Sequence, residues 1–248
     1  MRTFRNEAPV QNGHLVQRRY DYYGDDTVKI TYTLKYILEF DGVDDYLLVT
    51  HSSGINPSSN ITVEWYGKSN TDTWNSYGML VSKRDAYILH PEEGTKEIRF
   101  HILGETFAGV TSVKDITSPR HYVGTYDGTD IKIYEDGALM STVNSPGVIA
   151  ADTGDLYIGQ DDGFGNDRVF NGQMAIVRIW SRTLNDDEIQ NLYIQRQART
   201  VTGLDTSLEL NLVMSDGKGT SVTDSSGNGN HGTISGATWV GRDSGALF

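Results

Sequence analysis

Cysteine is absent from this 248-residue chain, which excludes disulfide frameworks, thiolate zinc sites and thiol catalysis. Proline supplies only 5 residues against 27 glycines, a balance that favours many tight turns over a Pro-rich disordered segment. Long apolar runs are also absent, and none approaches the roughly 18 to 20 residues that a membrane helix requires. The N-terminal residues lack the apolar segment of a secretory signal, so we expect neither membrane insertion nor Sec export.

Basic residues are fewer than acidic ones: 21 Lys and Arg stand against 33 Asp and Glu, which gives a formal net charge of −12. This charge disfavours binding to duplex nucleic acid. The first 20 residues depart from the balance, because they contain four arginines and a single glutamate. We interpret residues 1–27 as an N-terminal arm and as the candidate attachment point for an acidic partner.

The chain does contain a series of short alternating segments. From Val28 onward, apolar and polar residues alternate with the period of a β-strand. Segments of five to eight residues repeat this pattern between turn residues, at 46–50, 61–68, 77–83, 97–103, 121–126, 131–137, 156–160 and 174–180. Asp127-Gly128 and Asp136-Gly137 predict tight hairpin turns, which need positive φ. Many short strands without helices between them predict antiparallel pairing.

One segment, residues 183–199, has the helical period instead. Asn185 is an N-cap candidate with Glu188 three residues later, and Ile189, Leu192 and Tyr193 fall on one apolar stripe. The sequence therefore predicts one short helix on an otherwise β protein.

Six motifs carry a family resemblance. They are Leu38–Val49, Ile61–Lys68, Met79–Tyr87, His121–Leu139, Leu156–Asp161 and Phe170–Ile189. In order and spacing they resemble the laminin G-like jelly rolls of the concanavalin A-like lectin/glucanase superfamily. The resemblance implies an all-β fold, an antiparallel two-sheet jelly-roll β-sandwich with one short helix. Stacked sheets would bury the alternating apolar faces. The predicted core residues are Trp65, Tyr87, Phe100, Tyr122, Tyr134, Ile179 and Trp180.

The order of one segment is unusual. Residues 208–248 resemble the stretch that opens such domains, yet here they come last. Circular permutation, donation of these strands to a neighbouring subunit, and the remnant of a second domain are the three explanations. A lone half domain would leave its apolar residues without a core, so we favour the first two. We therefore assign 28–248 to one jelly roll, whose opening strands come from 208–248.

The superfamily includes glucanases, whose catalytic pattern is E-x-D-x-x-E. In retaining enzymes the two catalytic carboxylates lie about 5 to 5.5 Å apart. The nearest match, from Glu39 to Asp44, lacks the final Glu and has Gly42 inside it. Nucleophile elbows and phosphate-binding loops are also absent from the sequence. We therefore expect no enzymatic activity.

Calcium is the candidate cofactor. The six histidines show no i, i+4 pairing, so no zinc site is predicted. Carboxylates crowd two turns, and oxygen ligands of this kind suit Ca²⁺. The candidate ligands are Asp41, Asp44 and Asp45 in the first turn, and Asp161, Asp162 and Asp167 in the second. The resemblance also implies an acidic pair in the strand before the helix, where this chain has Ala175 and Ile176, so a cation that depends on that strand would be lost.

Glycans are the candidate ligands. Sugar binding needs an exposed aromatic ring for stacking, with amide or carboxylate groups for the hydroxyls. Two loops supply these residue types: the first contains Trp74, Asn75 and Tyr77, and the second contains Phe164 and Asn166.

Two functions follow from these observations. The first is a non-enzymatic surface or virion module, such as a phage particle component, with cell-surface carbohydrate as its candidate ligand and a virion or extracellular location. Its partners would be other copies of itself or neighbouring virion or surface proteins, reached through the N-terminal arm and the C-terminal strands. The alternative is a secreted or surface-attached lectin-like adhesion protein with no virion role. The fold alone does not choose between them.

Overall fold

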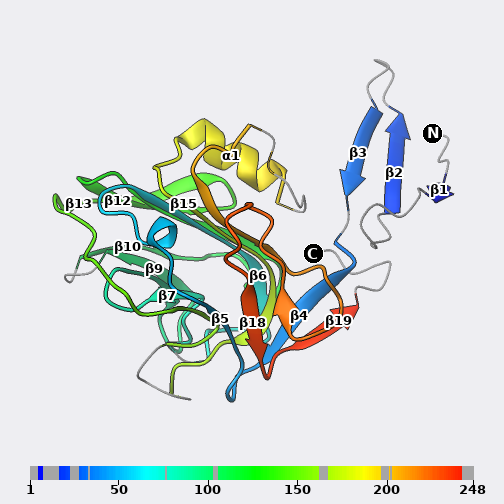
Figure 1. Ribbon diagram of the computed structural model, residues 1–248, viewed down its shortest axis with the longest axis horizontal. Helices are drawn as coiled ribbons and strands as arrows, with labels where there is room; N and C mark the ends of the chain where they lie inside the picture. The colour runs from blue at the N-terminus through cyan, green and yellow to red at the C-terminus, as the bar shows by residue number, and fades with distance from the viewer. Residues whose placement is uncertain are drawn as a thin grey trace.

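The computed structural model describes residues 5–7, 17–22, 28–32, 34–75, 77–102, 106–161, 167–196, 201 and 203–241 (Figure 1). Most of these residues lie in short strands. The elements are β1 Arg5–Glu7, β2 Gln17–Tyr22, β3 Val28–Tyr32, β4 Tyr36–Asp41, β5 Tyr46–Val49, η1 Ser53–Ile55, β6 Ile61–Ser69, β7 Val81–Lys83, β8 Tyr87–Pro91, β9 Glu97–Ile102, β10 Phe107–Thr111, β11 Arg120–Tyr126, β12 Asp130–Glu135, β13 Ala138–Asn144, β14 Leu156–Ile158, β15 Asn171–Trp180, α1 Asp186–Ile194, β16 Leu208–Val213, β17 Ser221–Val222, β18 Gly232–Ser235 and β19 Thr238–Gly241.

Two antiparallel sheets form the sandwich (Figure 1). One has eight strands in the order β10-β9-β8-β7-β14-β5-β18-β17. In the other, seven strands follow the order β13-β12-β11-β6-β15-β4-β19, after which we call it the seven-stranded sheet, and an eighth strand, β16, pairs with the second half of β15. This arrangement confirms the predicted all-β, two-sheet antiparallel sandwich.

The predicted hairpin turns are present because their residues can adopt the left-handed backbone. Asp136 and Gly137 have φ of 51° and 82° and join β12 to β13. Gly128 has φ of 89° in the turn between β11 and β12. The Asp127 side chain accepts hydrogen bonds from the backbone N–H groups of Thr129 and Asp130, which fixes that turn.

The main core lies between the sheets, where alternate residues of each strand meet. Trp65 packs there against Tyr122, with ring centroids 6.0 Å apart, and against Phe170 at 5.9 Å. All seven predicted core residues are buried. Two of them, Tyr134 and Trp180, belong to a second cluster, which lies on the other face of the seven-stranded sheet together with residues of α1.

Helix α1 forms where the sequence predicts it. The Asn185 side chain accepts a hydrogen bond from the Glu188 N–H, and the Glu188 carboxylate accepts one from the Asn185 N–H, which completes a capping box. Ile189 and Leu192 are the buried residues of the helix and pack in the second cluster. Within the described residues, no helix is both long and apolar enough to cross a membrane.

The N-terminal strands form a separate sheet. β1, β2 and β3 pair in that order, and Figure 1 shows them beside the sandwich. The strand expected to run on from residue 28 is divided: β3 pairs with β2, whereas β4 pairs with β15 and β19. β3 therefore pairs in the N-terminal sheet, and β4 is the first strand that pairs in the sandwich. Alternation identifies a strand but does not identify its partner, so the domain boundary at residue 28 stays a prediction.

The C-terminal segment enters both sheets of its own chain. β16 pairs with β15 and β19 with β4 in the seven-stranded sheet, while β18 pairs with β5 in the eight-stranded sheet. Its apolar residues Leu210, Leu212 and Met214 are buried in the main core. Pairing within one chain is the arrangement that circular permutation predicts, and exchange between copies stays a prediction.

Candidate functional site

The outer face of the eight-stranded sheet carries a row of side chains that crosses six strands. In β9, Ile98, Phe100 and Ile102 point into the core, so the residues between them face outward. The strand registers align the outward residues side by side, in the order Phe107, His101, Ile88, Ser82, Tyr157 and Leu48. Ser82 is buried within this row and the others are partly exposed.

A buried carboxylate lies at the centre of this face. Asp161 is 1% exposed, and its Oδ1 accepts a hydrogen bond from Ser82 Oγ at 3.0 Å. Its Oδ2 binds Arg84 at 2.8 Å and Arg168 at 3.0 Å. Two guanidinium groups therefore neutralise Asp161. This pairing corrects the expectation that Asp161 is a calcium ligand, because its oxygens already have cationic and hydroxyl partners. Asp167 is exposed beside this cluster, and Asp162 lies outside the described residues.

Trp74 and Tyr77 have opposite environments. Trp74 is 1% exposed and packs in the core against Trp65, at 6.5 Å between ring centroids, and Phe170, at 6.4 Å. The prediction that Trp74 offers its ring to a sugar is therefore wrong, because the core covers both of its faces. Tyr77 is 37% exposed, and the Arg168 guanidinium lies 5.8 Å from its ring centroid. Tyr77 is thus the exposed aromatic residue of this loop.

The amide of Asn75 holds the loop in place. Its Nδ2 donates to the carbonyl of Val169 at 3.1 Å, and its Oδ1 accepts from the N–H of Asn171 at 3.2 Å. These bonds tie Asn75 to the residues at the start of β15. Phe164 and Asn166, the other predicted sugar contacts, lie outside the described residues.

Further rings extend the face on both sides of Asp161. Tyr46 and Tyr157 contact each other with centroids 5.6 Å apart, on β5 and β14. Toward the other edge, His90 stacks on His101 at 4.7 Å, and His101 contacts Phe107 at 4.7 Å. No sequence pattern predicted these contacts, because they join residues of different strands.

Positive charge and burial keep the two histidines neutral. Burial, and then the charges of His90 and Arg99, lower the pKa of His101 to about 4. Burial also lowers the pKa of His90, against the opposing hydrogen bond to the Pro91 carbonyl. At neutral pH the stack therefore presents uncharged imidazole rings.

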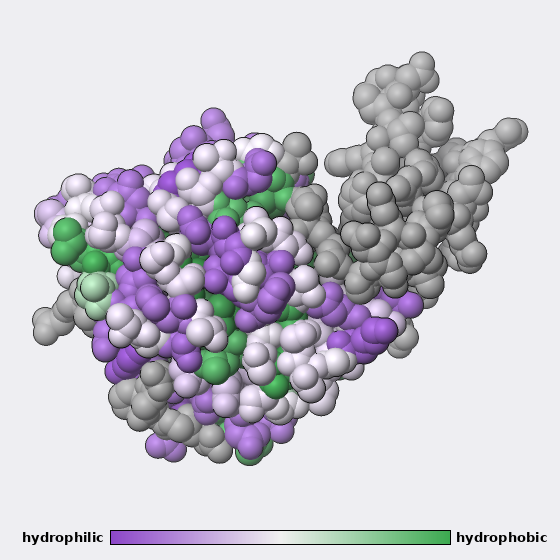
Figure 2. Space-filling view, viewed as in Figure 1, coloured by the Kyte–Doolittle hydropathy of each residue, from purple (hydrophilic) through white to green (hydrophobic). Residues whose placement is uncertain are grey.

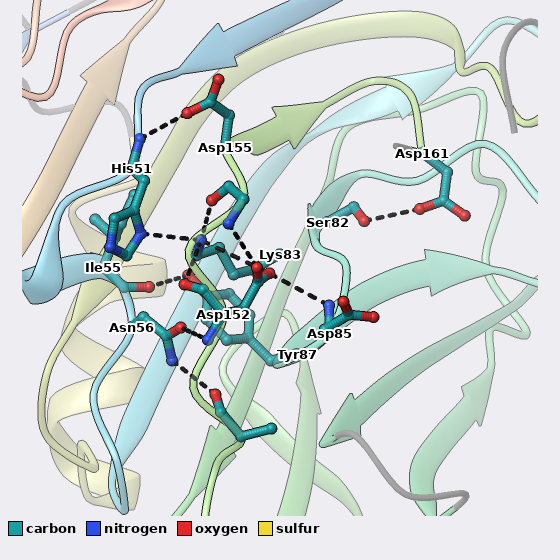
Figure 3. A network of polar contacts seen from close by, with 12 residues as sticks. His51, Ile55, Asn56, Ser82, Lys83, Asp85, Tyr87, Asp152, Asp155 and Asp161 are labelled. Atoms are coloured by element: carbon teal, nitrogen blue, oxygen red, sulfur yellow. Dashed lines mark hydrogen bonds and ion pairs between the residues drawn. The ribbon is translucent and has the colours of Figure 1, made fainter. Parts of the chain in front are cut away.

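Beneath the loops at one end of this sheet lies a buried lysine (Figure 3). The Nζ of Lys83 contacts the carbonyl oxygens of Asp152, at 3.0 Å, and of Gly154. His51 Nδ1 lies 3.2 Å from the same nitrogen, and Asp152 Oδ2 lies 3.7 Å from it. Burial lowers the pKa of the Lys83 amine, against the opposing charge of Asp152. The ammonium group thus joins three segments of the chain, those of His51, Lys83 and residues 152–154.

The other predicted calcium cluster does assemble. Ligand oxygens of Asp41, Asp44 and Asp45 lie within 4.8 Å of one another. Asp45 is 5% exposed, and its Oδ2 accepts a hydrogen bond from the N–H of Asp41. Burial, and then the charges of Asp41 and Asp44, raise the pKa of Asp45. Three converging carboxylates could hold a metal ion, since a divalent cation would relieve their repulsion.

The nearest match to a glucanase motif has structural partners. The Glu39 carboxylate accepts hydrogen bonds from Asn70 Nδ2 at 2.6 Å and Gln173 Nε2 at 2.5 Å. Asp41 accepts the N–H of Val43, two residues later, as in an Asx turn. These residues therefore stabilise the end of β4 and the turn that follows.

A second polar network is fully buried in the seven-stranded sheet. Glu64 pairs with Arg178 at 3.0 Å and with His121 Nε2 at 2.9 Å, and all three side chains are 0% exposed. Arg178 Nε also donates to Asn211 Oδ1 on β16. Burial acts to raise the pKa of Glu64, but Arg178 and His121 hold it below its usual range. Without solvent access, this network stabilises the fold.

An open depression of about 540 Å³ lies at the start of α1. Two of its hydroxyl groups already have partners: the Tyr134 hydroxyl donates to Asp186 Oδ1 at 2.8 Å, and Thr183 Oγ1 donates to the Tyr126 carbonyl. The outer face of the eight-stranded sheet, which combines exposed rings with charged groups, is the better candidate site.

Comparisons with known proteins agree with this architecture. A family model described as Laminin_G_3, Concanavalin A-like lectin/glucanases superfamily, matches residues 41–190, more than half of the chain. No curated protein matches the sequence. A proposed carbohydrate-binding protein from Bacteroides ovatus superposes with a TM-score of 0.66 at 20% identity, over 93% of this chain and 69% of that one. A heptameric SAP-like pentraxin from Limulus polyphemus gives 0.57 at 12% identity, over 87% and 98%.

Proposed function

This chain belongs to the concanavalin A-like lectin/glucanases superfamily, and from that membership we propose that it is a carbohydrate-binding module without enzymatic activity. The similar Bacteroides ovatus protein, itself a proposed carbohydrate binder, supports this choice of ligand class. The proposal favours a secreted or surface-attached lectin-like role. Assembly into a virus particle, which the sequence suggested, gains no support from the fold or the comparisons and stays a prediction.

The observation that carries the proposal is the outer face of the eight-stranded sheet. Tyr77 exposes its ring there, and Tyr46 and Tyr157 add partly exposed rings on the other side of Asp161. Aromatic rings stack on the apolar faces of sugars, while fixed charged and amide groups receive the hydroxyls. Arg84 and Arg168, held by Asp161, supply such groups between the rings.

A glycan array with purified protein tests this proposal. We expect the wild type to bind a defined set of glycans and Tyr77→Ala to lose most of that signal. Tyr193→Ala is the matched control, because Tyr193 lies on α1 against the other sheet. Flat binding by the wild type, or equal binding by Tyr77→Ala and the wild type, would contradict the proposal.

We also propose that Asp41, Asp44 and Asp45 bind calcium. Calcium should raise the melting temperature of the wild type and EDTA should lower it, whereas Asp44→Asn should respond less to both. If glycan binding persists in EDTA, the calcium site stabilises the fold and does not contact the ligand. An identical melting temperature with calcium and with EDTA would remove the site.

A further inference from the structure

The row of side chains on the outer face of the eight-stranded sheet is longer than one sugar unit. Strand by strand, it consists of Phe107, His101, Ile88, Ser82, Tyr157 and Leu48. We call these residues the cross-strand row. Neighbouring strands lie about 4.8 Å apart, so the row is about 24 Å long from β10 to β5.

Aromatic rings lie in both halves of the cross-strand row. In one half His101 contacts Phe107, with ring centroids 4.7 Å apart. In the other half Tyr157 contacts Tyr46 at 5.6 Å. All four rings are partly exposed. His101 and Tyr157 are separated by three strand spacings, or about 14 Å, which is wider than a pyranose ring. One sugar unit therefore cannot stack on both aromatic groups.

Hydrogen-bonding groups lie between the two aromatic groups. Ser82, in the middle of the row, donates to Asp161. The same carboxylate holds Arg84 and Arg168, whose side chains are 33% and 28% exposed. The buried carboxylate thus fixes the positions of two partly exposed guanidinium groups. Fixed N–H donors of this kind bind the hydroxyl oxygens of a sugar.

The charged side chains beside the row have partners of opposite sign. Arg99 binds the carboxylate of Glu92 at 2.5 Å and that of Glu97 at 3.0 Å. Asp161 pairs with its two arginines in the same way. The pKa of His101, lowered to about 4 chiefly by burial, leaves its ring uncharged at neutral pH. These pairings favour a neutral ligand.

The rest of the molecule disfavours an acidic ligand. The chain has a net charge of −12, and Figure 2 shows hydrophilic residues over most of the face in view, with hydrophobic atoms in small groups between them. A polyanion would be repelled by a protein of this charge. The ligand class that fits both the row and the charge is therefore a neutral sugar chain.

We propose that the cross-strand row binds an internal stretch of a neutral, extended polysaccharide, laid across the strands. The inference rests on the proposed carbohydrate-binding function and names its ligand class. Different sugar units of one chain stack on the two aromatic groups, while the units between them receive the guanidinium N–H groups. Equatorial β-1,4 linkages keep a sugar chain extended enough to follow the row, whereas α-1,4 linkages make it coil.

Isothermal titration calorimetry on the full chain tests the length of the bound ligand. The probes are β-1,4-linked oligomers of glucose, xylose and mannose, from the monosaccharide to the hexasaccharide. Coiled α-1,4-linked glucose oligomers and acidic galacturonic acid oligomers serve as comparisons. We expect at least one β-1,4-linked series to bind, with an affinity that rises about tenfold or more from the disaccharide to the hexasaccharide.

The outcomes separate this inference from the proposed function. An affinity that is equal at all lengths would show recognition of a chain end; it would overturn the inference and leave carbohydrate binding intact. Preference for the coiled or the acidic oligomers would also overturn it. Binding to none of the β-1,4-linked series would overturn the inference as well, whereas only a flat glycan array removes the proposed function.

Variants in the two halves of the row provide a second measurement. Tyr157→Ala and Phe107→Ala each remove one ring, and Tyr193→Ala on α1 is the matched control. Both row variants should bind the hexasaccharide about three- to tenfold more weakly than the wild type. No more than one of them should weaken binding of the disaccharide, which is too short to contact both rings. Melting temperatures confirm that each variant is folded, and full hexasaccharide affinity in either folded variant would contradict the inference.

Discussion

At the scale of single residues, Trp74 and Tyr77 have different roles because one is buried and the other is exposed. They are three residues apart in one loop, yet Trp74 packs in the core and Tyr77 faces solvent. Trp74→Ala should lower the free energy of unfolding by about 3 to 5 kcal/mol, because it removes a large buried ring and leaves a cavity. Tyr77→Ala should lower it by no more than about 1 kcal/mol.

Urea denaturation of both variants measures this difference. The comparison also separates the two roles, because only Tyr77→Ala should lose glycan binding while it keeps its stability. An equal loss of stability in the two variants would show that the loop does not place them as described.

His101 predicts a pH dependence of stability. Its pKa is lowered from 6.5 to about 4 in the folded chain, chiefly by burial and then by His90 and Arg99. The unfolded chain takes up this proton near pH 6.5, whereas the folded chain resists it until about pH 4. The stability that the neutral imidazole gives is thus complete above pH 6.5 and decreases as the pH falls toward 4.

Melting temperatures recorded between pH 6.5 and pH 4 test this predicted loss of stability. We expect a decrease on acidification for the wild type and a smaller decrease for His101→Phe, which retains the stacked ring and cannot titrate. Equal slopes for the two proteins would assign the acid sensitivity to other groups.

Helix α1 is the element that the sequence predicted most completely. Its capping box, its acidic first turn and its buried stripe are all local features. Asn185→Ala removes the side chain that accepts the Glu188 N–H and should lower the free energy of unfolding by about 1 kcal/mol. Chemical denaturation measures this loss, and Asn185→Asp, which can still accept that bond, should retain most of the stability.

Neighbouring residues of strand β7 point to opposite faces of the sheet and stabilise different parts of the structure. Ser82 points outward and binds Asp161, whereas Lys83 is buried on the inner side and binds Asp152 and Gly154. Lys83→Met would remove the cationic partner of the Asp152 carboxylate, which would keep only the backbone N–H groups of Asp85 and Gly154, and would remove the donor to two buried carbonyl groups. We expect a loss of about 3 kcal/mol in the free energy of unfolding.

Lys83→Arg is the control for this prediction. It keeps the charge, but its planar guanidinium does not fit the same acceptors, so partial recovery is expected. Denaturation curves that coincide for Lys83→Met and the wild type would show that the ammonium group adds no net stability.

At the scale of the whole molecule, the C-terminal segment is an integral part of both sheets. A chain that ends before residue 208 would lose β16, β18 and β19 and expose the core faces of β15, β5 and β4. We expect it to lose cooperative unfolding, as measured by circular dichroism. A full-length oligomer whose truncated form is a folded monomer would instead support strand donation.

The sequence by itself determined the features that depend on near neighbours. The strand periods, the Asp-Gly turns and the capping box of α1 each involve residues a few positions apart, and all are present in the structure. The six family motifs, by their order along the chain, also predicted the two-sheet architecture that the structure shows.

Only the tertiary structure decided which side chains meet. Asp161 looked like a calcium ligand beside other acids, but its partner Arg84 lies 77 residues away in the sequence. Lys83 binds the Asp152 carbonyl, 69 residues away in the sequence, and Trp74 packs against Trp65 of β6 and against Phe170, which precedes β15. A local pattern records the charge and size of a residue, whereas its burial and its partners are set by how distant strands pack.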